Sequence, residues 1–106
     1  MSIVVDVADL PGTLSGFGTG FLLTTRDGRI KVVSAAPRLL EGRLLVQAPG
    51  RGSLANVSAE PAVTLLWPPR ATGGPSLLVD GTAEVHGDDV VVTPSGAVLH
   101  RSVPES

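Results

Sequence analysis

The sequence predicts a mainly β fold, a small antiparallel barrel of six or seven strands with one or two short helices. Three observations predict it. Val and Leu are abundant, whereas the aromatic residues are two Phe and one Trp. Thirteen Gly and nine Pro interrupt the chain throughout, which favours short strands over long helices. Residues 76–85 alternate between apolar and polar, as a strand with one buried face does. A sheet with few covering helices is expected to close on itself.

The predicted strands follow from apolar stretches and the turn residues between them. Asp27-Gly28 is a hairpin signal, and a second turn lies around Glu41-Gly42. Gly81 falls in mid-strand on the apolar side, where we expect a bulge or bend. The predicted strands are residues 21–25, 30–34, 43–48, 62–67, 76–85, 90–92 and 97–101.

One or two short helices are expected. The first spans residues 9–14, with Asp9 as its N-cap. The second follows the third strand, with Ser53 as the N-cap candidate and Pro61 as its end.

Length, charge and cysteine content limit the classes of function. The 106 residues form one domain, residues 1–106, with a lead-in over 1–16 and a frayed tail over 102–106. Eight basic and ten acidic residues give a net charge of −2 without a run of either sign, which argues against nucleic acid or an anionic membrane as partner. The absence of Cys excludes disulfides and thiolate metal sites. We expect a soluble cytoplasmic protein without a metal site.

Side chains for acid–base or nucleophilic catalysis are scarce, and the catalytic residues stay unknown. The two histidines, His86 and His100, lie beside strand ends and are interpreted as surface or hydrogen-bonded structural residues. Asp88-Asp89 fits ordinary turn chemistry. Trp67, before two prolines, is either a core or interface anchor or a stacking platform for a planar ligand.

One group of neighbouring residues could bind an anion. Gly50-Arg51-Gly52-Ser53 opens the predicted second helix, where free N–H groups and the positive end of the helix dipole favour an anion. The Arg51 guanidinium and the Ser53 hydroxyl suit a phosphate group, although a flexible connection with a solvated Arg is the alternative. Lys31, the only lysine, lies in mid-strand and projects from the face opposite Ile30 and Val32. An exposed face or a phosphate contact would explain it.

These residues, taken together, resemble the pyridoxamine 5′-phosphate oxidase-like family, in particular a short actinobacterial-type branch of it. The resemblance covers most of the chain, from Gly18 to Arg101. The segments that carry it are Asp27-Gly28-Arg29 and residues 31–34, 44–46, 50–56, 60–65, 76–85, 92–94 and 98–101.

The resemblance implies a split β-barrel that forms a homodimer, with flavin mononucleotide (FMN) held in two clefts at the subunit interface. A small-molecule substrate would meet the cofactor there. Asn56 matches an Asn in the helix of such proteins that caps or packs rather than contacting flavin. Carried over to this chain, the cofactor-binding residues are Lys31, Val33 and Ser34 on one side, and Ala48, Arg51 and Ser53 on the other.

Three functions follow from this resemblance. The first is an FMN-dependent oxidoreductase in which the cofactor carries the redox chemistry. The second is a protein that binds a deazaflavin, coenzyme F420, which related split barrels use. The third is a non-catalytic dimer that has lost its cofactor, because the family often has Lys or Arg where Ser53 stands and the chain has few aromatic residues.

Overall fold

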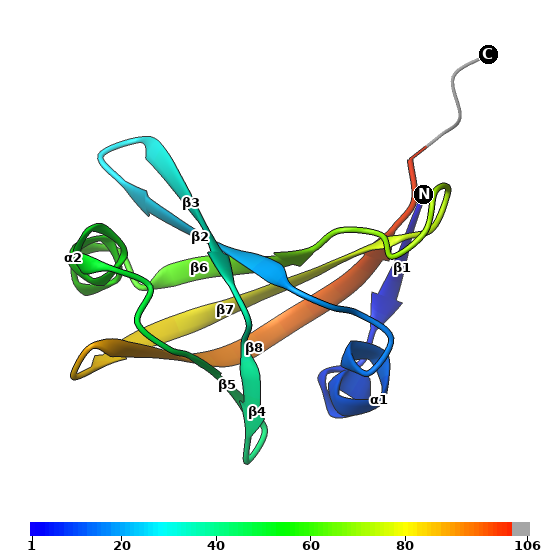
Figure 1. The fold of residues 1–106 in the computed structure, drawn as a ribbon, viewed down its shortest axis with the longest axis horizontal. Helices are drawn as coiled ribbons and strands as arrows, with labels where there is room; N and C mark the ends of the chain where they lie inside the picture. Colours follow the sequence, from blue (N-terminus) through cyan, green and yellow to red (C-terminus); the bar gives the residue numbers. More distant parts are fainter. Residues whose placement is uncertain (103–106) are drawn as a thin grey trace.

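A single antiparallel sheet with two short helices at opposite ends of the molecule makes up the fold (Figure 1). This computed structural model describes residues 1–102. The helices are α1 (Leu10–Leu14), which follows a 3₁₀ turn (Val7–Asp9), and α2 (Arg51–Ala59). The strands are β1 (Ser2–Val5), β2 (Gly20–Arg26), β3 (Arg29–Ala35), β4 (Arg38–Leu40), β5 (Arg43–Val46), β6 (Ala62–Trp67), β7 (Ser76–His86) and β8 (Asp89–His100).

The strand order explains why the barrel is split. The order is β3-β2-β6-β7-β8-β5-β4, and β1 pairs with β8 as well. β8 is long enough to pair with β5 through residues 90–92 and with β1 through residues 97–100. Within residues 1–102, no ladder joins β3 to β4, so the sheet stays open. The mainly β, split-barrel prediction is confirmed, with eight strands rather than six or seven.

The β2–β3 hairpin has the turn that its sequence predicts. Asp27 has φ 51° and Gly28 has φ 77°, and positive φ at both central residues defines the type I′ turn that matches the twist of the strands. Arg26 and Arg29 are cross-strand partners that flank this turn.

The predicted bulge at Gly81 is also confirmed, and it lies between β7 and β8. The register passes from Asp80 opposite Gly96 to Gly81 opposite Pro94, so Ser95 is the extra residue. Glycine is needed here because the first side-chain carbon of any other residue would lie 2.6 Å from the Thr93 carbonyl oxygen.

The core lies between the bent halves of the sheet and is mostly Leu and Val. Trp67 is only 2% exposed and belongs to this core cluster, so of its two interpretations the core anchor is confirmed. Leu10 and Val57 are buried on the two helices. The other buried apolar residues of the cluster are Leu22, Leu44, Val46, Val63, Leu65, Leu77, Val79, Ala83, Val90, Val92 and Ala97.

Three strand predictions were wrong, each because pairing overrode the local pattern. β1 lies in the predicted lead-in: its mostly exposed residues show no alternation, but its backbone completes the edge of β8. β4 is three exposed residues that pair with β5. The separate strands at 90–92 and 97–101 are one strand, because the bulge accommodates Pro94 within β8.

The region around the start of α2 also differs from the prediction. β5 ends at Val46 rather than at residue 48, and Ala48 has φ 44°. The N-cap of α2 is Gly50, with φ 102° and ψ 162°, rather than Ser53. This conformation is essentially restricted to glycine. The backbone conformation, rather than a side-chain hydrogen bond from Ser53, therefore sets where α2 begins. The predicted tail at 102–106 lies, beyond Ser102, outside the described residues.

Neither α1 nor α2, the helices of residues 1–102, has the length and apolar character needed to span a membrane.

The bulge gives a stability prediction. Gly81→Ala should lower the free energy of unfolding by about 1–3 kcal/mol, because the added carbon meets backbone that cannot move aside. Gly96→Ala, across the same bulge, is the control, since a carbon added there meets nothing within 4 Å. Urea denaturation of both variants checks this, and equal midpoints would contradict the tight packing at Gly81.

Candidate functional site

Helix α2 is fastened to the β2–β3 hairpin by side-chain hydrogen bonds. Asn56 Nδ2 donates to the Oγ1 of Thr24, a fully buried residue, at 3.0 Å. Glu60 accepts from Thr25 Oγ1 at 2.9 Å and from the Asp27 backbone N–H at 3.2 Å. The packing role predicted for Asn56 is therefore confirmed, and the hairpin is held against the helix.

This attachment places Lys31 across the first turn of α2. The first carbon of a side chain at position 52 would lie 2.9 Å from Lys31 Cε and 3.1 Å from Lys31 Nζ. Gly52 thus leaves the space that the Lys31 side chain fills. Lys31 lies on the opposite face of β3 from Ile30, as the sequence predicts, and Arg51 is the residue before Gly52.

The hairpin and Lys31 line a cavity of about 600 Å³. Three of its lining residues are cationic, and within residues 1–102 none of them, nor Arg51, forms an ion pair. The Arg26–Arg29 pair places like charges opposite each other, which is unfavourable. We call this cavity the hairpin cavity; its lining residues are Arg26, Asp27, Arg29, Ile30, Lys31 and Asn56.

The local electrostatics favour an anion beside Lys31. The first intrahelical hydrogen bond of α2 runs from the Leu54 N–H to the Gly50 carbonyl at 3.1 Å, so the N–H groups of residues 51–53 have no partner in the helix. This end of a helix dipole is positive and disfavours a cation by about 0.3–1 kcal/mol. The positive charge of Lys31 is therefore repelled by the helix end when no ligand is present, whereas an anion between them would be attracted by both.

The other predicted site residues are spread around this point. Val33 shares the core-facing side of β3 with Lys31 and is half-buried, whereas Ser34 is exposed on the opposite face. Ala48 is exposed, and its backbone N–H donates to Asp89 Oδ1 at 2.9 Å, so this amide already has a partner. Of the predicted set, the structure brings Lys31 together with the first turn of α2, where Arg51 and Ser53 lie.

Ser53 lies in the first turn of α2 but faces the interior. The residue has no exposed surface, and its Oγ has no hydrogen-bond partner. In the described part of the chain, it is the one buried side-chain polar atom without a partner. The Ser53 hydroxyl is thus enclosed in this structure, and its backbone N–H is the group at the helix start.

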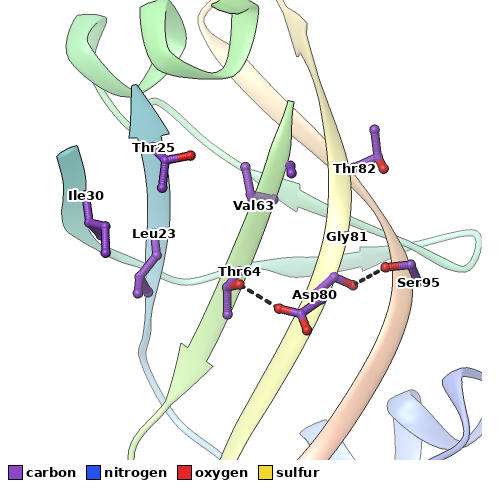
Figure 2. Close-up of a pocket in the computed structure, with 10 residues that line it drawn as sticks. Leu23, Thr25, Ile30, Val63, Thr64, Asp80, Gly81, Thr82 and Ser95 are labelled. Carbon is purple, nitrogen blue, oxygen red and sulfur yellow. Dashed lines mark hydrogen bonds between the residues drawn. The ribbon is translucent and has the colours of Figure 1, made fainter. Parts of the chain in front are cut away.

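A second cavity, of about 460 Å³, lies on the outer face of the sheet beside the bulge (Figure 2). Asp80 is its only charged residue, and Thr64 Oγ1 donates to Asp80 Oδ1 at 2.6 Å. Ser95 Oγ donates to the Asp80 carbonyl at 3.2 Å. We call it the sheet hollow; its lining residues are Leu23, Thr25, Ile30, Ala62, Val63, Thr64, Asp80, Gly81, Thr82 and Ser95.

The histidines have ordinary surface partners, as interpreted from the sequence. His100 Nδ1 is 2.9 Å from Ser2 Oγ, and His86 Nε2 is 3.2 Å from Glu84 Oε2. Over residues 1–102, there is no group of three or more His, Asp or Glu residues that could hold a metal ion.

Comparison of sequences finds relatives in mycobacteria. The uncharacterised protein Mb0449c of Mycobacterium bovis is 34% identical over 120 residues, which cover 96% of this chain and 84% of that protein. No protein-family model matches the chain.

Comparison of folds finds flavin-binding proteins. A FAD-binding protein from Mesorhizobium loti superposes with a TM-score of 0.71 at 16% identity, over 93% of this chain and 96% of that one. A candidate pyridoxamine 5′-phosphate oxidase from Listeria innocua gives a TM-score of 0.71 at 14% identity, over 91% and 98%.

The split sheet with its hairpin and α2 therefore defines the class: the chain has the fold of the pyridoxamine 5′-phosphate oxidase-like proteins, as the sequence motifs predicted. Within that class, the chain belongs to the same family as Mb0449c of Mycobacterium bovis.

Sequence reasoning missed several residues of both cavities. Arg26 and Arg29 flank the predicted Asp27-Gly28 turn, and a two-residue loop places its flanking residues beside each other, but the sequence alone indicates no binding role for them. The alternation of residues 76–85 places Asp80 on the polar face of its strand and indicates no further role. Its proximity to Thr64 depends on the β6–β7 register, which one strand alone does not reveal.

Ser53 gives a stability prediction. Ser53→Ala should raise the free energy of unfolding by about 1 kcal/mol, because a buried hydroxyl without a partner is removed. Ser58→Ala, an exposed serine of the same helix, is the control for helix propensity. Chemical denaturation compares the two, and a loss of stability confined to Ser53→Ala would mean that the hydroxyl has a partner.

Proposed function

We propose that this protein binds a flavin, FMN in the first place, with the phosphate held between Lys31 and the first turn of α2. The single observation that carries the proposal is that Lys31 lies across Gly52 at the positive end of α2 without an ion pair in residues 1–102. The flavin-binding proteins of the same fold support it.

The donors present fit a phosphate. Lys31 and Arg51 supply two positive charges, and the helix start supplies backbone N–H groups. Charge-assisted hydrogen bonds of this kind are the strong ones in proteins. Ser53 would contribute its backbone N–H rather than its enclosed hydroxyl, and Val33 would line the approach to the phosphate from the same face of β3 as Lys31. Ser34 faces the other way, and the Ala48 N–H is already bonded to Asp89. Arg26 and Arg29 add further positive charge from the hairpin.

The protein's own part in such a reaction is binding and orientation. A bound flavin would supply hydride or electron transfer, which suits a chain with few side chains for acid–base catalysis. Anchoring the phosphate at α2 fixes one end of the cofactor, so that the ring system extends along β3. The substrate would meet the ring there.

We further propose a cytoplasmic homodimer that pairs through the outer face of β3. Ile30 is 67% exposed and Val32 54% exposed on this face, and neighbouring exposed apolar residues on a sheet are typical of an interface. The second copy would complete the cofactor cleft.

Two alternative functions are compatible with the same fold. A deazaflavin such as F420 also bears a phosphate and would use the same cations. A dimer without cofactor is favoured by the modest number of phosphate donors, since Ser53 stands where the family often has Lys or Arg.

FMN titration tests the proposal. We expect a dissociation constant below about 10 µM, which corresponds to a binding free energy near −7 kcal/mol. Quenching of flavin fluorescence during the titration measures it. Arg51→Ala and Lys31→Ala should each weaken binding about 10- to 100-fold, because a charge-assisted hydrogen bond contributes about 1.5–3 kcal/mol.

The matched control is Arg43→Ala, which removes the same charge from the β4–β5 hairpin, away from α2 (Figure 1). It should leave FMN binding unchanged. Binding of F420 but not FMN would favour the deazaflavin, and no binding of either would favour the cofactor-free dimer. Equal losses in all three variants would mean a general charge effect.

The dimer has its own prediction. Ile30→Asp should convert the dimer to a monomer, because an unpaired carboxylate would be placed in an apolar interface. Ile3→Asp is the control, an isoleucine 62% exposed on β1. Sedimentation equilibrium measures both masses; a monomeric wild type, or a dimer that persists in Ile30→Asp, would contradict the interface.

A further inference from the structure

We infer that the cofactor is a flavin adenine dinucleotide (FAD), whose second phosphate and adenine end lie in the hairpin cavity against Arg26 and Arg29. The inference rests on the proposed flavin function and deepens it. The flavin half keeps its phosphate between Lys31 and the first turn of α2, and the hairpin cavity receives the part of the cofactor that lies beyond that phosphate.

Arg26 and Arg29 lie on the same face of the hairpin as Lys31. Lys31 is paired with Thr24, and Arg29 is paired with Arg26, two residues further toward the turn. Residues two apart in a strand share a face, so the arginine pair lies about 7 Å further along this face than Lys31. Thr24 accepts the hydrogen bond from Asn56, so the row of cations begins where α2 is attached to the hairpin.

The arginine pair has no counter-charge of its own. Arg26 and Arg29 are direct cross-strand partners, and within residues 1–102 neither forms an ion pair. Asp27 is the one carboxylate in the lining, and it leaves the cavity net positive. Glu60, the carboxylate that reaches the turn, accepts from Thr25 and from the Asp27 N–H rather than from a guanidinium. An anion between the two arginines would replace their repulsion by attraction.

The hairpin cavity is larger than a single phosphate requires. Its volume of about 600 Å³ is in the range of sites for whole small molecules, whereas FMN ends at its phosphate. With that phosphate between Lys31 and α2 and the ring system along β3, FMN has no group left for the arginine pair. A dinucleotide continues past this phosphate with a second phosphate, a ribose and an adenine.

Arginine suits both of these additional groups. Its planar guanidinium bonds phosphate oxygens in a bidentate manner and also stacks on aromatic rings. One arginine of the pair can therefore hold the second phosphate while the other covers the adenine. The pair and the cavity together select a cofactor that carries both groups.

Calorimetric titration with FAD and with FMN tests the inference. At low salt, FAD should bind about tenfold more tightly than FMN, the difference that one additional charge-assisted hydrogen bond makes. Arg26→Gln and Arg29→Gln should each weaken FAD binding about three- to tenfold and leave FMN binding within about twofold, as expected for exposed charge contacts. Both variants should stay folded, because each removes one of two opposed like charges.

Asp27→Asn gives a test of the opposite sign. Asparagine tolerates the positive φ of 51° at this position, so the turn is preserved while the lining carboxylate is removed. FAD binding should become about two- to fivefold tighter, and FMN binding should change less. Weaker FAD binding in this variant would overturn the inference.

Arg43→Gln is the matched control, since it removes the same charge from the β4–β5 hairpin and should bind both flavins like the wild type. FAD binding no tighter than FMN binding, or losses in Arg43→Gln equal to those in Arg26→Gln and Arg29→Gln, would overturn this inference. In both cases FMN binding leaves the proposed function intact. Failure of both FMN and FAD to bind would overturn the proposed function and the inference together.

Discussion

The attachment of α2 to the β2–β3 hairpin is the constraint on which the rest of the site depends. Asn56 and Glu60 are hydrogen-bonded to residues of β2 and the turn, one at the middle of the helix and one at its end. Because the hydrogen bonds lie at two separated points, rotation or sliding of the helix relative to the hairpin would break them. These bonds hold the first turn of α2 beside Lys31, where the proposed phosphate donors lie.

This rigid arrangement collects positive charge that the fold alone does not neutralise. Arg26 and Arg29 oppose each other across the turn, and Lys31 lies at the positive end of α2. Glu60, a nearby carboxylate, is occupied by the hairpin itself. Like charges held close together lower the stability of the fold. An anion bound between them would replace this repulsion by attraction and so raise the stability. Ligand binding and folding stability are thus coupled through the same side chains.

Local signals in the sequence predicted what depends on neighbouring residues, and failed where distant strands decide. The Asp27-Gly28 turn and the Gly81 bulge were predictable because each needs a particular backbone conformation. β1 was not, because its residues form a strand only beside the edge of β8. Lys31 and Arg51, the proposed phosphate donors, stand out in the sequence as motifs, whereas the Thr64–Asp80 contact depends on the register between β6 and β7.

Strand β3 connects the two cavities because its faces have opposite chemistry. Lys31 projects toward α2, whereas Ile30 lies on the outer face and lines the sheet hollow as well as the hairpin cavity. As the first strand in the sheet order, β3 has a free edge within residues 1–102. A cofactor with an anionic phosphate and an apolar ring system has the same division of charge. The alternation of this edge strand therefore places a positive charge toward α2 and apolar surface on the outer face, which is the division that the flavin proposal uses.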